Sequence, residues 1–549
     1  MKKIALILLS IFVLFCVVSC SKYEDKKSRV VISINSDITS LNPMFAVSYT
    51  EGMIAEQIFL RLVDQKWNNE KGGLDTFPML AEKWEWSDDS TSITLHLRDD
   101  IQWQDSVAFT AEDIVFTFDI YSDPVTESKF IGTFNNYYLR DDFSIDIEKS
   151  FEIISDSELK INFLSGSTPG FFDFDLPILP KHILEKIDRK ELATSEFNHN
   201  PIGNGPYKLK SWKPNQAIIL TADSISYLYN NDMINELVFN VIPDYNSRFL
   251  QLLSGDVDLM QDVRVESVPL ISDKYQLTIG KVEGREYDYV GWNNIDPEIF
   301  ASKGEIVPHK LFGNREVRKA LTLAINRKQI VDEFMKEYGS VASGPVSPIF
   351  KELVEDNLEP YPYNPDEALK ILKNEGWKDN NNDGFLDKDG QKFSFTLDYT
   401  SGNPLREFTA NIIQSNLSKI GIEVLINPVE SSVFFENMFA KSYDAWIGGW
   451  IVPIPVDLKP FWYSDLDESF PNVVSFQNEA ADSVLEKMRN KISVTEKRKL
   501  YKCFLEIMHR EQPVTFLYWK DDIVAYSKKI KGIEISPLGT VHHCWQWRI

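Results

Sequence analysis

The chain has 549 residues, of which 43% are hydrophobic and 13% aromatic, and its formal net charge is -24 at pH 7. This length exceeds what one hydrophobic core usually covers, so we expect two or more structural units. The acidic charge argues against nucleic-acid binding, which needs a basic surface, and suits a soluble protein whose partners are small molecules.

The N-terminal residues are typical of an export signal. Lys2 and Lys3 precede an apolar run from Ile4 to Val18, interrupted only by a serine. The run is too short and too near the terminus for an ordinary membrane span. No second apolar run is long enough to cross a bilayer, so we expect a chain that is exported and does not span the membrane.

The signal ends in Val17-Val18-Ser19-Cys20, which resembles the cleavage site of bacterial lipoproteins. The resemblance implies a signal peptide over residues 1–19 and acyl chains on Cys20 that anchor the protein to a membrane. Residues 20–28 are short, polar and charged, and are expected to be a tether. The alternative is an ordinary secretory signal that is cut elsewhere.

Two cysteines, Cys503 and Cys544, lie beyond this region. In an oxidising compartment they could form a disulfide, and as buried thiols they could equally stay free. Spacing alone leaves both possibilities open.

Directly after the tether, Arg29 to Ile34 is a short β-type run, and a second strand and a helix are predicted further along. Thr91 to Arg98 alternates polar and apolar residues, as a half-buried strand does. Thr110 and Asp113 form a capping-box-like pair, which predicts that a helix begins there and runs to Tyr121.

Further along, a glycine-containing loop precedes a predicted hairpin. Gly203 and Gly205 permit positive φ, and Tyr207 to Leu220 reads as two strands around the turn Lys213-Pro214-Asn215. The loop is not a phosphate-binding loop, because no helix and no Lys-Ser/Thr pair follows it. Asn314 is predicted to cap the next amphipathic helix.

A possible metal loop lies between Asp379 and Asp387. Asp379, Asn381, Asp383 and Asp387 occupy positions one, three, five and nine of an EF-hand pattern. Position twelve is Gly390, so the bidentate glutamate is missing. We predict no firm metal site here, and bound calcium and a plain hairpin turn both stay open.

The stretch from Tyr443 to Ser464 is the strongest candidate for a pocket wall. Its start, Tyr443 to Ile447, predicts a buried strand, and two glycines then let the backbone bend or approach another group closely. Trp450 and Trp462 follow on a loop that prolines make stiff and irregular. These aromatics either line a site or pack into the neighbouring core, and spacing does not decide between them.

Near the C-terminus, His542, His543 and Cys544 suggest a second metal site. Adjacent residues on a strand point to opposite faces, and no matching ligand set is near in the sequence. We therefore expect a structural end-strand there. The chain contains no HExxH and no GxSxG motif, and we expect no enzyme activity.

Many segments of the chain occur together, in one order and spacing, in a known family. They are Asp37 to Pro43, Pro78 to Trp84, Phe109 to Asp113, Pro180 to Ile183, Pro201 to Trp212, Leu252 to Asp258, Asn314 to Arg327 and Tyr443 to Trp450. This series resembles the family-5 extracellular solute-binding proteins, which include the oligopeptide- and dipeptide-binding receptors of ABC importers.

The resemblance implies an α/β fold with two lobes, the type II-like periplasmic-binding-protein fold in its large family-5 form, with the ligand held between the lobes. Lobe one is then expected at 29–268 plus 514–549, with an extra subdomain at about 61–199. Lobe two is expected at 269–513.

The resemblance also implies ligand-facing residues. Ser48 and Tyr49 correspond to a first-lobe loop that meets the ligand, and Trp292 and Asn293 correspond to a strand that lines the cleft. Trp450 corresponds to the family's glycine-tryptophan position. The alternatives are surface exposure for the first pair and a turn cap for Asn293.

One departure from the family concerns the ligand's charge. The peptide-binding members have an aspartate three residues after this tryptophan, which holds the ligand's α-ammonium, and this chain has Pro453. A buried ammonium without a partner is costly, so another group must hold it or the ligand is not a peptide. Asp457 could serve if the loop shifts. Closure of the lobes is expected to bury the ligand against Trp450, Trp462 and Trp292.

The function implied is that of a receptor that captures oligopeptides or a similar polar solute and delivers it to ABC permease and ATPase subunits. We expect a lipid-anchored monomer on the periplasmic or extracytoplasmic face of a bacterial cell envelope, without a cofactor. The alternatives are an anchored sensor, chaperone or adhesin with the same fold, and, more remotely, a hydrolase.

Overall fold

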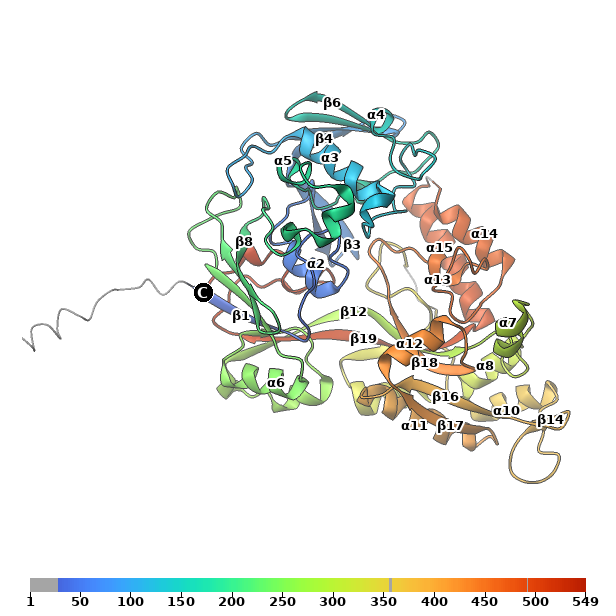
Figure 1. Cartoon of the computed structure of the whole chain (residues 1–549). Helices are drawn as coiled ribbons and strands as arrows, with labels where there is room; N and C mark the ends of the chain where they lie inside the picture. The colour runs from blue at the N-terminus through green and yellow to red at the C-terminus, as the bar shows by residue number, and fades with distance from the viewer. Residues whose placement is uncertain (1–27, 355–357, 491) are drawn as a thin grey trace, which may run out of the picture.

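The computed structural model describes residues 28–354, 358–490 and 492–549. Two long antiparallel strands, β12 (Leu277–Trp292) and β19 (Val514–Ser527), run side by side across the middle of the molecule (Figure 1). Within the described residues they are central to an eleven-stranded sheet with the order β17-β16-β18-β12-β19-β11-β1-β10-β9-β8, to which β13 adds by pairing with β19. The predicted signal peptide, tether and Cys20 lie outside the described residues.

The elements before β12 form the first lobe. In chain order they are β1 (Arg29–Ile34), α2 (Tyr49–Ala55), β2 (Val63–Asn68), β3 (Gly73–Pro78), β4 (Ala81–Trp86), β5 (Ser92–Leu97), α3 (Ala111–Ser122), α4 (Ile147–Ser150), β6 (Phe151–Ser155), β7 (Glu158–Asn162), α5 (Lys181–Leu184), β8 (Tyr207–Lys213), β9 (Ala217–Ala222), β10 (Glu236–Val241), α6 (Tyr245–Ser254) and β11 (Leu259–Met260). The small sheet β4-β5-β7-β6 and the hairpin β2-β3 stand apart from the large sheet.

The elements between β12 and β19 form the second lobe. They are α7 (Pro297–Lys303), α8 (Arg315–Ala324), α9 (Arg327–Ile330), β13 (Gly339–Val341), α10 (Pro365–Asn374), β14 (Asp387–Lys388), β15 (Gln391–Lys392), β16 (Ser394–Thr400), α11 (Pro404–Ser418), β17 (Glu423–Val429), α12 (Ser431–Phe439), β18 (Ala445–Ile451), α13 (Lys459–Trp462), α14 (Glu479–Met488) and α15 (Val494–Glu511).

The hydrophobic core divides at the two long strands. One cluster takes residues between Val30 and Leu259 and returns with residues between Val524 and Trp547. Two further clusters draw almost entirely on residues after Tyr287 and before Ile523. The fold is therefore the predicted two-lobed α/β fold of periplasmic binding proteins, while the exact boundaries at 268 and 514 stay predictions.

Several local predictions are confirmed. Helix α3 begins after Thr110, whose backbone amide donates to the Asp113 carboxylate at 3.0 Å. Helix α8 is capped by Asn314, whose side chain accepts from the amide of Glu316 at 2.8 Å. Strands β8 and β9 flank the predicted turn at 213–215.

The loop before β8 requires glycine for a different reason from the one predicted. Gly203 and Gly205 do not adopt positive φ. Instead, a Cβ at Gly203 would lie 2.0 Å from the carbonyl oxygen of Ile58, and one at Gly205 would lie 2.5 Å from that of Gln57. Glycine is needed there because two backbone segments approach each other closely.

Two predictions near the C-terminal part of the chain are corrected. The strand expected at 443–447 is β18, and it continues through both glycines to Ile451. Gly449 allows a close approach, since a Cβ there would lie 2.2 Å from Asp288 Oδ1. The end-strand expected at His542 and His543 is wrong, because these residues form a turn that leads into the short 3-10 helix η8 (Cys544–Gln546).

Candidate functional site

Three adjoining cavities lie between the lobes. The first, of about 210 Å³, and the second, of about 300 Å³, share Tyr49. The second and the third, of about 280 Å³, share Phe172 of the first lobe and Ile454 of the second. The three hollows therefore form one elongated cleft with walls from both lobes.

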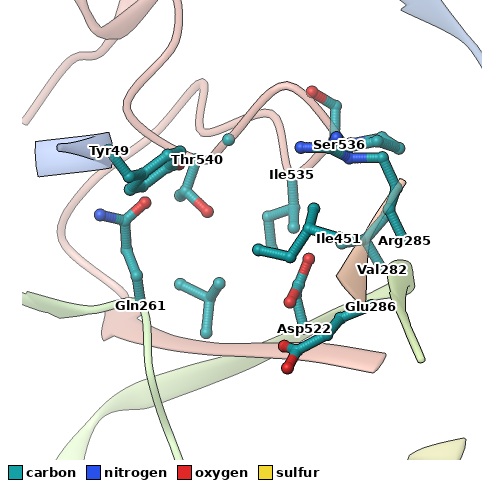
Figure 2. A pocket seen from close by; sticks show the side chains of 13 residues that line it. Tyr49, Gln261, Val282, Arg285, Glu286, Ile451, Asp522, Ile535, Ser536 and Thr540 are labelled. Carbon is teal, nitrogen blue, oxygen red and sulfur yellow. The ribbon is translucent and has the colours of Figure 1, made fainter. Parts of the chain in front are cut away.

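The first cavity brings charged groups from both long strands together. Arg285 on β12 and Asp522 on β19 project into the same hollow, with Tyr49 and Gln261 on the opposite side (Figure 2). Arg285 Nη1 donates to the carbonyl oxygen of Val452 at 2.6 Å. The Asp522 carboxylate forms no hydrogen bond or ion pair with any residue that the structure describes, although its backbone pairs with β12. The cavity thus offers an unpaired carboxylate and a guanidinium with spare donors.

The environment changes the acidity of these groups. Burial raises the pKa of Asp522 to about 6, and the negative charge of Glu286 adds to the rise. Burial lowers the pKa of Arg285, and the charge of Asp522 opposes that change. Asp522 is accessible to solvent through the cleft although protein surrounds it. A cation placed in this cavity would favour the ionised form of Asp522.

The second cavity is also rich in charge. Burial opposes ionisation of Glu56, but the charge and hydrogen bond of His542 outweigh it and lower the pKa of Glu56 to about 2. Burial raises the pKa of Asp175 to about 6, with the positive charge of Arg61 opposing the rise. Arg61 Nη1 donates to the carbonyl oxygen of Asp175 at 2.9 Å.

The third cavity has a more apolar wall. Trp67 of the first lobe meets Phe350 of the second edge to face, with ring centroids 5.7 Å apart. Pro455 and Val456 of the proline-containing loop complete the second-lobe side. This end of the cleft can accept apolar side chains.

Two predicted site residues lie at the start of α2. Tyr49 lines the first and second cavities, and its side chain is 61% exposed. Ser48 acts as the N-cap: its hydroxyl accepts from the amide of Glu51 at 3.2 Å, and Glu51 accepts from the amide of Ser48 at 2.8 Å. Ser48 therefore positions Tyr49 through the cap.

Trp292 and Asn293, which were expected to line the cleft, lie instead in the core. Both are fully buried. The Trp292 indole donates to Thr515 Oγ1 at 3.1 Å, and the Asn293 amide donates to the carbonyl oxygens of Lys441 and Tyr443 at 3.0 Å each. Their polar groups hold core segments together, and neither side chain reaches the cleft.

The loop after β18 packs mainly against its own lobe. Trp450 is half-buried with its ring centroid 5.1 Å from that of Phe461, and Trp462 is 3% exposed. Asp457 is exposed and accepts from the amide of Lys459 at 3.1 Å. None of the three residues lines any of the three cavities. From the same loop, Ile454 lines the second and third cavities and Pro455 lines the third.

The calcium candidate is a loop whose carboxylates accept from backbone amides. Asp379 Oδ1 accepts from the amide of Asp383 at 3.1 Å, and Asp383 Oδ1 accepts from that of Phe385 at 2.9 Å. Asp387 accepts from Asn380 and pairs in the short β14-β15 hairpin. These contacts are those of a hairpin turn.

The two cysteines beyond the signal are free. Cys503 is exposed on α15 and Cys544 is buried in the first lobe. Cys544 Sγ donates to Gln57 Oε1 at 3.0 Å. The two cysteines therefore form no disulfide with each other in this structure.

Arg285 and Asp522 are not among the site residues predicted from the sequence. Both lie on the long strands, in stretches that carry other charged residues such as Glu286 and Lys520. The paired aspartates Asp521 and Asp522 interrupt a strand that is otherwise largely buried, and this interruption is the signal that could have identified the site.

No helix among the residues described is both long and apolar enough to cross a membrane.

Comparison with known proteins places this geometry in a family. The model of "Bacterial extracellular solute-binding proteins, family 5 Middle" matches residues 75–470. "Oligopeptide-binding protein AppA" of Bacillus subtilis is 29% identical over 572 residues, which cover 100% of this chain and 99% of that protein. The solved structure of AppA with a nonapeptide has a TM-score of 0.75 at 28% identity, covering 95% of this chain and 100% of that one.

A second solved structure, NikZ from Campylobacter jejuni in complex with Ni(L-His), has a TM-score of 0.76 at 26% identity and covers 95% of this chain and 100% of that one. The family match spans well over half of the sequence, and the similar proteins extend over nearly all of it. The chain therefore belongs to the bacterial extracellular solute-binding proteins, family 5.

Proposed function

We propose that this protein is the substrate-binding receptor of an ABC importer and captures an oligopeptide, or a similar polar solute, between its lobes. The elongated cleft of three adjoining cavities carries the proposal. A row of hollows with two charge-rich parts and one more apolar end suits an extended ligand that carries both charged and apolar groups. The similarity to an oligopeptide-binding protein whose structure holds a nonapeptide supports the same ligand class.

Capture requires no chemistry on the solute. Strands β12 and β19 are the covalent links between the lobes, and Arg285 and Asp522 lie on them at the floor of the cleft. A small rotation about these strands would close Tyr49 and Ile454 onto a ligand and expel water. Micromolar affinity would correspond to about -8 kcal/mol, well within the range of such a cavity.

Asp522 is the residue that we propose for the ligand's ammonium group. Pro453 carries no carboxylate, and Asp457 is engaged with the amide of Lys459. Asp522 instead presents an unpaired carboxylate in the first cavity, where an ammonium would supply the missing opposite charge. Arg285, close by in the same cavity, would hold a carboxylate or carbonyl oxygen of the ligand.

The remaining parts of the proposal concern partners and place. The receptor would act as a monomer that is anchored through Cys20 and works with ABC permease and ATPase subunits. It would lie on the periplasmic or extracytoplasmic face of the cell envelope and would need no cofactor for peptide capture.

The proposal is tested by identifying the ligand directly. Gently purified protein is examined by native mass spectrometry, and peptides from dipeptides to nonapeptides are titrated by calorimetry and tryptophan fluorescence. We expect a co-purified peptide or saturable binding of part of the panel. A response to another solute class with none to peptides would overturn the peptide assignment, and peptide uptake that persists in a deletion strain would favour the sensor, chaperone or adhesin.

A further inference from the structure

Asp64, His542 and His543 converge beside the second cavity. Asp64 lies on β2, and the two histidines lie in the turn before η8. His543 has a φ of +58°, and the turn brings the two imidazole rings to 3.9 Å between centroids. One possible ligand atom from each of the three residues lies within 4.8 Å of the other two. A strand would have separated the histidines, whereas this turn places them on one side.

We propose that Asp64, His542 and His543 bind a divalent transition-metal ion such as Zn²⁺ or Ni²⁺. Two imidazole nitrogens and one carboxylate oxygen are the donor set of zinc sites that keep an open fourth position. Imidazole also suits nickel, whereas calcium and magnesium prefer all-oxygen sites. Across residues 28–354, 358–490 and 492–549, no other three such side chains converge in this way.

The contacts around His542 are those that orient a metal ligand. His542 Nδ1 lies 3.0 Å from Glu56 Oε1, and its Nε2 lies 3.1 Å from the carbonyl oxygen of Gln65. If one ring nitrogen binds the ion, the other can keep donating to its acceptor, as ligating histidines commonly do. The neighbouring carboxylate and carbonyl thus fix the ring without needing to bind the metal.

His543 and Asp64 are already in contact. His543 Nε2 lies 2.6 Å from Asp64 Oδ1, and an ion bound to both atoms would replace this hydrogen bond and move the two atoms apart. The Lys66 ammonium is 3.7 Å from Asp64 Oδ2, on the other carboxylate oxygen. An ion bound to Asp64 Oδ1 would leave this outer contact in place.

The site opens onto the cleft. His542 and Glu56 line the second cavity, whose volume is about 300 Å³. The side chains of Asp64, His542 and His543 are only 11%, 13% and 5% exposed, so the ion would be shielded from bulk water on most sides. Its open position would face the cavity, where water or a donor group of a bound solute could complete the coordination.

The test uses the full-length mature protein without a histidine tag, freed of metal by a chelator, and no peptide. Zn²⁺ and Ni²⁺ are titrated by calorimetry, and Co²⁺ is followed by its visible d–d absorption. We expect one ion per chain. Asp64→Asn and His543→Gln are each expected to weaken binding by about tenfold or more.

The matched control is His182→Gln. His182 Nε2 is 2.8 Å from Asp105 Oδ2, so it is also a histidine paired with an aspartate, but no second histidine joins it. This variant should bind the ion as the wild type does. Thermal unfolding without metal checks that each variant folds. If His543→Gln does not fold, the nearly isosteric Asp64→Asn alone tests whether these residues bind the ion.

Failure to bind one ion saturably, or equal binding by Asp64→Asn and the wild type, would overturn the metal site. Because no peptide is present, either result leaves the peptide proposal untouched.

Discussion

Arg406 holds Asp288 through two parallel hydrogen bonds. Its Nε lies 3.0 Å from Asp288 Oδ2 and its Nη2 lies 3.1 Å from Oδ1. Asp288 is fully buried on β12 and Arg406 lies near the start of α11, so the pair fixes a second-lobe helix to a strand that joins the lobes. Tyr518 on β19 also donates to Asp288, at 3.2 Å. The strands about which the lobes would close are thereby held rigidly to the second lobe.

Replacing Arg406 with methionine should destabilise the protein strongly. The variant leaves Asp288 buried with only the Lys520 ammonium, 3.3 Å away, as a charged partner. Removing one member of a buried pair costs about 3 kcal/mol or more of the free energy of unfolding. Urea denaturation measures the loss. Lys328→Met, which breaks an exposed pair with Asp332, is the control and should change stability by at most about 0.5 kcal/mol.

The same pair should make stability depend on acid pH. Burial opposes ionisation of Asp288, but the charges of Arg406 and Lys520 outweigh it and lower its pKa from 3.8 to about 2. A pKa that is lower in the folded state gives stability that is present above about pH 4 and is lost as the pH falls towards 2. Urea denaturation at several pH values should show this decline, and Arg406→Met should show a shallower one. Equal slopes would contradict this origin.

Gly449→Ala should also destabilise the second lobe. The new Cβ would lie 2.2 Å from Asp288 Oδ1 and 2.9 Å from the carbonyl oxygen of Tyr287. Both atoms lie on the paired strand β12, so relief requires a shift of the sheet, and overpacking of this kind costs about 1–3 kcal/mol. The control is Gly170→Ala, because a Cβ at Gly170 would meet open space, and thermal unfolding should show almost no change in stability. Gly402→Ala is not a suitable control, because Gly402 has a positive φ that would strain an alanine.

Local signals in the sequence predicted much of the fold. Thr110 and Asn314 mark helix starts because capping depends on neighbouring residues alone, and these predictions are confirmed. The cleft strand was harder, because the resemblance located Trp292 and Asn293 on a strand but could not tell which face of it meets the ligand.

The unpredicted site residues depend on contacts between distant segments. Arg285 and Asp522 meet only because β12 and β19 pair. We expected His542 and His543 to face opposite ways, because neighbouring residues on a strand do so. That prediction is wrong because the backbone turns at His543 instead of extending. Sequence periodicity therefore predicts elements better than it predicts the sites where elements meet.

Asp522→Asn should weaken peptide binding in a way that depends on the ligand's N-terminus. The proposed contact is between the Asp522 carboxylate and a free ammonium, and truncating one partner of such a charge pair costs about 2–5 kcal/mol. Calorimetry should therefore show a loss of about thirtyfold or more for a free peptide. The N-acetylated form of the same peptide is the control, and it should bind both proteins with similar affinity. Equal losses for both forms would place the ammonium elsewhere.

The affinity for peptides with a free N-terminus should fall below about pH 6. Burial raises the pKa of Asp522 to about 6 in the empty protein, so at lower pH the carboxyl is protonated and must lose its proton before it can pair with an ammonium. The affinity should then drop by up to about tenfold per pH unit, until the pH reaches the lower pKa of Asp522 in the complex. Calorimetry between pH 4.5 and 8 measures the profile. Asp175 in the second cavity also has a pKa of about 6, so the profile of Asp522→Asn is the decisive comparison. A flat profile in that variant assigns the dependence to Asp522, and an unchanged slope assigns it to another group such as Asp175.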